Sequence, residues 1–147
     1  MSTPSTSTRA DEMGLLARAA APLLARLFPD LPAHHLLRGP EIGTVMVRGR
    51  TGGTGAPFNL GEVTVTRCTV RMDCGTVGHA HVQGRDRDHA RRAAVLDALL
   101  QTDAAPDLRA RVLAPLTQAE TEARDLRARK AAATRVEFFT MVRGEVE

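Results

Sequence analysis

A glycine-rich stretch between residues 48 and 55 contains residue types that can bind anions. Its members are Arg48, Gly49, Arg50, Thr51, Gly52, Gly53, Thr54 and Gly55. Glycines allow several backbone N–H groups to point at one anion, while the arginines and threonine hydroxyls add charge and donors. The stretch is not a P-loop, because no Gly-Lys-Ser/Thr follows, and not a dinucleotide-binding motif, because no helix follows. Both an anion-binding nest and a mobile loop between strands therefore stay open.

Two cysteines and two histidines form a second group with possible chemistry: Cys68, Cys74, His79 and His81. The histidines are two residues apart on a predicted strand, so their imidazoles leave one face at roughly 6.6 Å spacing. One metal ion can bind both if further ligands converge, but Cys-x5-Cys-x4-His-x-His is not a usual zinc spacing. A nucleophilic Cys–His pair also lacks a third, orienting group. A small metalloenzyme is one hypothesis, and a polar strand face or an interface strand is the plainer interpretation.

The other acids and histidines form no catalytic arrangement in the sequence. General acid–base catalysis favours paired carboxylates in apolar surroundings, whereas Asp86 and Asp88 are explained by a helix start and neighbouring arginines. His89 shares a predicted helix face with Ala93 and Leu96, which indicates a buried, hydrogen-bonded histidine and not a base. We therefore predict no catalytic residue and no metal site in this chain.

Length and composition limit the class of protein further. The 147 residues fit one domain, which we place at residues 11–147 after a flexible Ser/Thr-rich tail at residues 1–10. Four phenylalanines without any Trp or Tyr disfavour a nucleic-acid binder that stacks bases. The longest apolar run is far shorter than a membrane span, and the N-terminus does not have the pattern of a secretory signal. We expect a cytoplasmic protein without nucleic-acid or membrane partners.

Apolar residues at helical spacing predict an amphipathic helix over residues 11–28. Pro22 lies inside this pattern and should kink or split the helix. After Pro32 we expect a short helical segment through His34 and Leu37, ended by the Gly-Pro pair that follows.

From residue 42 onward the hydrophobic period changes to two, which predicts strands. A tight turn is expected at residues 73–75. The apolar parity changes within one strand, which predicts a bulge near Thr66 or Arg67. The last predicted strand has apolar residues on both faces, so each face should pack against another segment or another chain. The expected strands are residues 43–48, 62–72, 76–83 and 136–142.

Two further helices follow the central strands. Asp86 is placed to cap a helix starting at Arg87, and a Thr117-x-x-Glu120 capping box predicts a helix to about residue 133. The last helix has a narrow apolar stripe, so burial against a partner chain is an open possibility. The elements together predict an α+β fold, with a mainly antiparallel sheet of about four strands and N-terminal, central and C-terminal helices.

Four segments carry more information than periodicity alone. They are Arg50-Thr-Gly-Gly-Thr-Gly55, Gly61-Glu-Val-Thr-Val-Thr-Arg67 with Val70-Arg71, Gly75-Thr-Val-Gly78 with Val82-Gln-Gly-Arg-Asp86, and Arg135-Val-Glu-Phe-Phe-Thr-Met-Val-Arg-Gly144. Together they closely resemble the PhnG family, the small subunit of the bacterial carbon–phosphorus lyase core complex, over residues 12–145. The sequence departs from the family at His81, where an aromatic residue is common, and at Cys74.

The resemblance implies an accessory subunit that is not catalytic alone. In that family PhnG assembles with PhnH, PhnI and PhnJ in a two-fold symmetric core complex, with PhnL and PhnK associated. The G, H and I subunits, helped by PhnL, replace the adenine of ATP with methylphosphonate and form α-D-ribose 1-methylphosphonate 5-triphosphate. PhnI is regarded as the nucleosidase-like catalytic subunit. MgATP and methylphosphonate are then substrates of the complex, and no cofactor is expected on this chain.

The same motifs supply the interface candidates. We expect the glycine-rich loop, the turn before residue 87 and the C-terminal segment to face PhnI or a shared site. Besides the loop, the candidate residues are Gly84, Arg85, Asp86, Phe138, Phe139, Met141 and Arg143. A stand-alone anion- or nucleotide-binding module that uses the glycine-rich loop is the competing hypothesis, beside the metalloenzyme.

Overall fold

A computed structural model describes residues 8–135, which form an α+β fold with one antiparallel sheet in the order β1-β2-β3. The described part of the chain has three strands, so the prediction of about four is not matched, and the predicted strand at 136–142 lies outside it. A 3-10 turn, η1 (Thr51–Gly53), links β1 to β2, and a π-helical turn, η2 (Arg109–Leu113), precedes the last helix. The main elements are α1 (Arg9–Arg18), α2 (Ala21–Leu27), β1 (His34–Arg50), β2 (Pro57–Met72), β3 (Val77–Gln83), α3 (Arg87–Leu99), α4 (Ala105–Leu108) and α5 (Ala114–Ala133).

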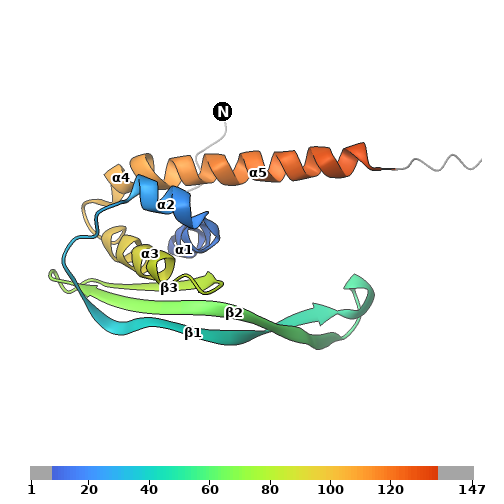
Figure 1. The fold of residues 1–147 in the computed structure, drawn as a ribbon, viewed down its shortest axis with the longest axis horizontal. Coiled ribbons are helices and arrows are strands. Elements are labelled where there is room, and N and C mark those ends of the chain that lie inside the picture. Colours follow the sequence, from blue (N-terminus) through green and yellow to red (C-terminus); the bar gives the residue numbers. More distant parts are fainter. Residues whose placement is uncertain (1–7, 136–147) are drawn as a thin grey trace, which may run out of the picture.

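Helix α3 lies against the sheet with α1 beside it, also in contact with β3, and α2 and α5 lie beyond them (Figure 1). The helix comes close to β3 because Gly78 has no side chain: a Cβ there would lie 2.0 Å from the Ala94 carbonyl oxygen and 2.6 Å from the Ala98 nitrogen. The buried face of α3 is itself rich in alanine, which allows this approach. The largest fully buried apolar side chains of the core are Leu16, Leu24, Val70, Val82, Val95, Leu96 and Val112.

The sheet has three strands at one end and two at the other. Strand β3 pairs with β2 only between Val65 and Arg71, whereas β1 and β2 pair along their whole lengths. The two strands therefore continue as a long ribbon that projects from the body (Figure 1). The predicted ranges 43–48 and 62–72 are correct in type but too short, because β1 begins at His34 and β2 at Pro57.

The segment at residues 34–37 is the first part of β1 and not the predicted short helix. It pairs with the buried end of β2, where His34 lies opposite Met72 and Leu36 opposite Val70. Pairing with β2, which is already covered by α3, stabilises these residues as a strand more than the local sequence after Pro32 favours a helix.

No bulge interrupts β2 near Thr66 or Arg67: the register shift that borders Arg67 has its extra residue on β1, between Arg38 and Glu41. Register shifts occur between Leu36 and Arg38, between Arg38 and Glu41, and between Val47 and Arg48, whereas the register around Thr66 is unbroken with both neighbouring strands. Val65 and Thr66 are both buried although successive strand residues point to opposite faces. The sheet is therefore covered on both faces at this point. This explains why the apolar residues of β2 change from one face to the other without a bulge.

The N-terminal helix starts at Arg9, slightly before the predicted boundary at residue 11. Thr8 caps it: its side chain accepts the backbone N–H of Asp11, and the Asp11 carboxylate accepts the N–H of Thr8. The helical region splits as predicted, with Pro22 in the first turn of α2.

Helix α5 starts at Ala114, so the predicted capping box at Thr117 is wrong. The Thr117 hydroxyl instead donates to the Leu113 carbonyl inside a helix, because η2 continues directly into the first turn that contains Pro115. The predicted end near residue 133 is confirmed. Every residue from 121 to 135 is exposed, so the second half of α5 extends away from the body.

Candidate functional site

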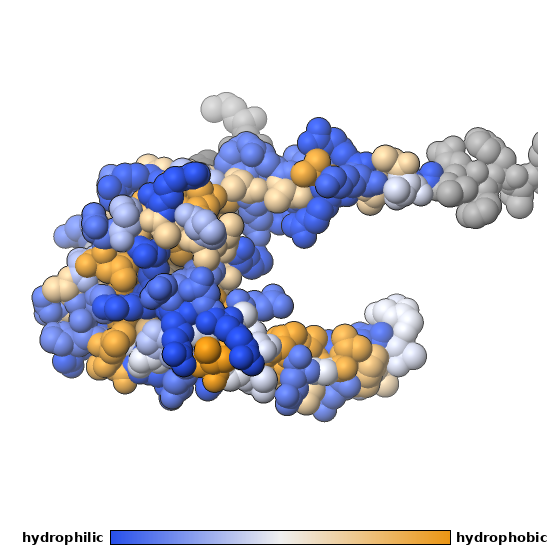
Figure 2. All heavy atoms as spheres, viewed as in Figure 1, coloured by the Kyte–Doolittle hydropathy of each residue, from blue (hydrophilic) through white to orange (hydrophobic). Residues whose placement is uncertain are grey.

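Two segments project from the packed body on the same side (Figure 1). We name residues 43–62 the ribbon arm and residues 121–135 the helical arm. Figure 2 shows an open concavity between them, with hydrophobic residues gathered along the ribbon arm and mainly hydrophilic residues along the helical arm. The chain thus presents two surfaces of different chemistry around one hollow.

The ribbon arm exposes large apolar side chains. Met46 is 50% exposed, Phe58 is 44% exposed and Leu60 is 65% exposed. A two-stranded ribbon has no core of its own and is marginally stable in water. A group of such side chains on a projecting element is typical of a protein–protein interface.

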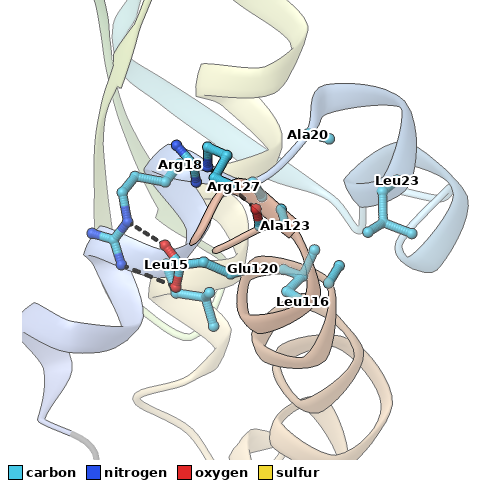
Figure 3. Close-up of a pocket in the computed structure, with 10 residues that line it drawn as sticks. Leu15, Arg18, Ala20, Leu23, Leu116, Glu120, Ala123 and Arg127 are labelled. Carbon is cyan, nitrogen blue, oxygen red and sulfur yellow. Dashed lines mark hydrogen bonds and ion pairs between the residues drawn. The ribbon is translucent and has the colours of Figure 1, made fainter. Parts of the chain in front are cut away.

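A groove of about 340 Å³ lies at the base of the helical arm (Figure 3). Its floor is apolar, with Leu15 from α1, Leu23 from α2 and Leu116 from α5. On one side Arg18 Nε donates to Glu120 Oε1 at 2.7 Å and joins α1 to α5. This hydrogen bond holds the pKa of Glu120 below its ordinary value and raises the pKa of Arg18.

A second, more open hollow of about 650 Å³ lies between the end of α1 and the ribbon. Arg18 and Ala19 line both this hollow and the groove, so the end of α1 forms the wall between the two. The remaining lining residues are Ala17, Val47, Val63, Val65, His81, Gln83, Gly84 and His89.

Ion pairs of long sequence separation fix α1 against the body. The Arg9 guanidinium donates two hydrogen bonds to the buried Asp97 carboxylate, at 2.9 and 2.7 Å, and Asp97 also accepts the backbone N–H of His79. The buried Glu12 carboxylate accepts from Arg109 Nε at 2.6 Å. These hydrogen bonds raise the pKa values of Arg9 and Arg109. These ion pairs therefore hold α1, whose end separates the groove from the second hollow, against α3 and η2.

The glycine-rich loop lies at the tip of the ribbon arm. Gly52 and Gly53 have φ values of 60° and 83°, which L side chains rarely adopt, so these two positions require glycine. Two of the groups suggested for an anion nest hold the loop itself: Gly55 N–H donates to the Thr51 carbonyl, and Arg50 Nη1 donates to the Gly55 carbonyl. The loop is closed by its own hydrogen bonds and is exposed.

The structure does not bring Gly84, Arg85 and Asp86 near this loop. Gly84 N–H donates to the Thr64 carbonyl, and Thr64 pairs with Thr44 on β1. Six residues of strand separate Thr44 from Arg50, which is roughly 20 Å. The two predicted segments therefore belong to the base and the tip of the ribbon and cannot form one small-molecule site.

The cysteines and histidines of the metalloenzyme hypothesis do not converge. Cys68 is buried on the α3 side of β2, whereas His79 and His81 alternate with the buried residues of β3 and are exposed. Cys74 lies in the exposed turn after β2. Burial raises the pKa of the Cys68 thiol, while a hydrogen bond with Thr76 lowers that of Cys74. Across residues 8–135, no three His, Cys, Asp or Glu side chains are grouped as metal ligands.

The buried histidine is confirmed. His89 is 7% exposed, and its Nε2 donates to the Leu16 carbonyl at 2.7 Å. Phe138, Phe139, Met141 and Arg143 lie outside the described residues, so their predicted interface role is a proposal only. Residue spacing gives no sign of the ion pairs Arg9–Asp97 and Arg109–Glu12, since their partners are 88 and 97 residues apart and leave no local pattern.

Comparison with known proteins decides the family. A family model described as "Phosphonate metabolism protein PhnG" matches residues 7–144. The chain belongs to the PhnG family. It is 50% identical over 141 residues to the alpha-D-ribose 1-methylphosphonate 5-triphosphate synthase subunit PhnG of Rhizobium meliloti (strain 1021), which covers 93% of this chain and 90% of the relative. Membership confirms the resemblance seen in the four sequence segments. Within residues 8–135, no helix combines the length and apolar character that a bilayer crossing requires.

The PhnG motif Val82-Gln-Gly-Arg-Asp86 has a structural role in this chain. Val82 is buried in the core, Gly84 has a φ of 97° and accepts the Thr66 hydroxyl, and the Asp86 carboxylate accepts the N–H of His89 to cap α3. The motif therefore makes the turn that passes the chain from β3 into α3, as the predicted cap at Asp86 requires. Arg85 is exposed and follows Gly84, which lines the second hollow.

Proposed function

We propose that this chain is the accessory subunit of a carbon–phosphorus lyase core complex. In this role it acts with PhnH, PhnI and PhnL in the ATP-dependent formation of α-D-ribose 1-methylphosphonate 5-triphosphate, in which methylphosphonate displaces adenine. PhnI, PhnH and PhnJ are its partners in a hetero-oligomer, with PhnL and PhnK associated. MgATP and methylphosphonate are substrates of the assembly in the cytoplasm, and this chain holds no cofactor and no catalytic residue of its own.

The observation that carries the proposal is the pair of projecting arms. The ribbon arm exposes apolar side chains that the chain's own core does not cover, and the helical arm is exposed along its whole length. Removing the apolar side chains of the ribbon arm from water is favourable, so a partner chain is the natural cover for that arm. The relative from Rhizobium meliloti is named as a subunit of a synthase, which supports the same conclusion.

The interface assignment follows the arms. We propose that the ribbon arm, with the loop from Arg50 to Gly55 at its tip, contacts PhnI, and that the C-terminal segment with Phe139 and Met141 contributes to the same interface. The turn at the base of the ribbon, with Gly84, Arg85 and Asp86, then faces PhnI or a site that the subunits share.

Reconstitution tests the proposal. Co-expression of this chain with PhnI and PhnH, followed by sizing, should yield a stable complex. Adenine release from ATP in the presence of methylphosphonate and PhnL should occur with all subunits and fall to background when this chain is omitted. The isolated chain should neither release adenine nor bind ATP.

Two results would overturn the proposal. One is a chain that stays monomeric and separate when its partners are present at micromolar concentration. The other is an isolated chain whose Gly52, Gly53 and Gly55 amide signals shift on titration with ATP, which would favour the stand-alone anion-binding module.

A further inference from the structure

The two faces of α5 differ in charge along the helical arm. The face toward α1 and α2 continues the groove with Ala119, Ala123 and Arg127. A separate hollow on another face is lined by Glu122, Asp125, Ala128 and Arg129. The two acids of the helical arm thus lie away from the groove, next to Arg129, and that outer face is mixed in charge.

The groove face has more basic than acidic groups: Arg18 and Arg127 both lie near Glu120 and lower its pKa. Lys130 is three residues after Arg127 and seven after Ala123, so it lies on the same side of the helix. Glu120, an acid of this face, is already paired with Arg18. Within residues 8–135, neither Arg127 nor Lys130 forms an ion pair.

The groove and the helical arm together form one amphipathic strip. Leu15, Leu23 and Leu116 make its base apolar, and Leu126, which is 46% exposed, extends apolar surface along the arm. From Leu116 to Lys130 the helix rises by roughly 21 Å. A strip that is apolar at its base and basic toward its end fits a partner segment that is apolar at one end and acidic at the other.

We propose that this strip binds an acidic amphipathic helix of a partner subunit. Its apolar residues fill the groove, and its carboxylates pair with Arg127 and Lys130. This inference rests on the proposed function and specifies which side of α5 the partner contacts. A second copy of this chain fits less well, because the outer face of its α5 places Arg129 beside the two acids and lacks a purely acidic stripe.

A charge reversal on each face tests the proposal. Arg127→Glu and Arg129→Glu make the same chemical change on the same exposed helix, two residues apart, so only the face differs. Tagged variant and untagged wild-type chain compete for limiting co-expressed PhnI, PhnH and PhnJ, and mass spectrometry measures the fraction incorporated. We expect Arg127→Glu to reduce incorporation by about five- to tenfold and Arg129→Glu by less than about twofold. Lys130→Glu should resemble Arg127→Glu, and unchanged thermal unfolding would show that the fold is intact.

The outcomes separate this inference from the proposed function. If wild-type chain assembles while both reversals behave alike, the assignment of the groove face is wrong and the subunit role stands. If wild-type chain does not assemble, the proposed function fails first. Wild-type complexes should also lose this chain as the NaCl concentration rises, and complete indifference to salt would contradict the ionic contact.

A cysteine probe identifies the occupant. In a Cys74→Ser background, where Cys68 is buried, Ala123→Cys places one reactive thiol in the groove. A bulky maleimide should label it in the isolated full-length chain and fail to label it in the complex. Protection in the isolated chain would assign the groove to residues 136–147 or to a second copy, and labelling in the complex would leave the groove empty. Either result overturns the proposal.

Discussion

Strand β2 passes through two regions that differ in cover and not in strand type. Its C-terminal half lies under α3, and the buried residues Cys68, Val70 and Met72 alternate there with more exposed ones such as Arg67 and Arg71. Its N-terminal half, residues 57–62, belongs to the ribbon arm and is exposed throughout. Phe58 and Leu60 are as apolar as the residues of the covered half, so it is the presence of a third strand and a helix that separates the two regions.

The body and the arms differ in how much of their surface the chain itself covers. The body has a close-packed core, in which α1 is fixed by buried acids and α3 approaches the sheet at Gly78. The arms contribute little to that core and hold the surfaces available to partners. Substitutions in the body should therefore change folding, whereas substitutions in the arms should change assembly.

The largest expected effect separates two glycines of the same sheet. Gly78→Ala should lower the free energy of unfolding by about 3 kcal/mol or more, because the new Cβ overlaps the backbone of α3. Gly61→Ala, in the ribbon arm, meets nothing within 4 Å and should change stability by less than about 0.5 kcal/mol. Urea unfolding followed by circular dichroism measures both, and similar losses would contradict the division into body and arms.

A smaller effect is expected at the buried carboxylate of the body. Asp97→Ala removes the partner of Arg9 and of the His79 N–H, and should cost about 2 to 3 kcal/mol. The matched control is Asp107→Ala, whose ion pair with Arg111 is exposed on both sides and should cost less than about 1 kcal/mol. Chemical denaturation of the two variants gives the comparison, and an equal cost would show that α1 is not fixed by this pair.

In the ribbon arm the expected effect falls on binding alone. Met46→Ser and Leu60→Ser should leave the unfolding free energy of the isolated chain within about 0.5 kcal/mol. Each should weaken assembly with PhnI by roughly five- to thirtyfold, since burial of such a side chain contributes about 1 to 2 kcal/mol. Leu37→Ser, equally exposed but outside the arm, is the control and should assemble normally. Normal assembly of all three would remove the ribbon arm from the interface.

The smallest expected effect concerns pH at the groove. Because Arg18 lowers the pKa of Glu120, their pair stabilises the fold above the ordinary glutamate pKa of about 4.3 and is lost as pH falls through the lowered value. Arg18 is 61% exposed, so solvent screening limits the contribution to about 0.5 kcal/mol. Glu120→Gln should show this loss at pH 7 and none at pH 2, measured by urea unfolding. A larger gap at pH 2 would contradict the assigned sign.

Local signals in the sequence predicted the features that depend on few neighbouring residues. Asp86 caps α3, Pro22 splits the N-terminal helices, and the turn at residues 73–75 has Gly75 at a φ of 89°. Each of these is decided by backbone geometry and by hydrogen bonds within a few residues. The α+β class and the family followed from the same kind of local pattern.

Predictions failed where contacts with segments distant in the sequence determine the local structure. Residues 34–37 became strand because β2 offers them a pairing partner, and Thr117 became helix interior because η2 already supplies the first turn. The candidate site was affected in the same way. The glycine-rich loop was recognised as unusual, but only the register shows that it lies at a ribbon tip, about 20 Å from Gly84.

The sequence by itself determined the family, the order of helices and strands through most of the described chain, and the absence of an evident catalytic pair. These depend on residue identity and on contacts a few positions apart. Only the tertiary structure decided that β1 and β2 extend far past β3 and leave the ribbon uncovered, that α5 extends beyond the body, and that Arg127 lies on the groove side. Whether a residue is buried depends on which segments meet in space. Segments far apart in the chain produce no regular spacing in the sequence that could predict this.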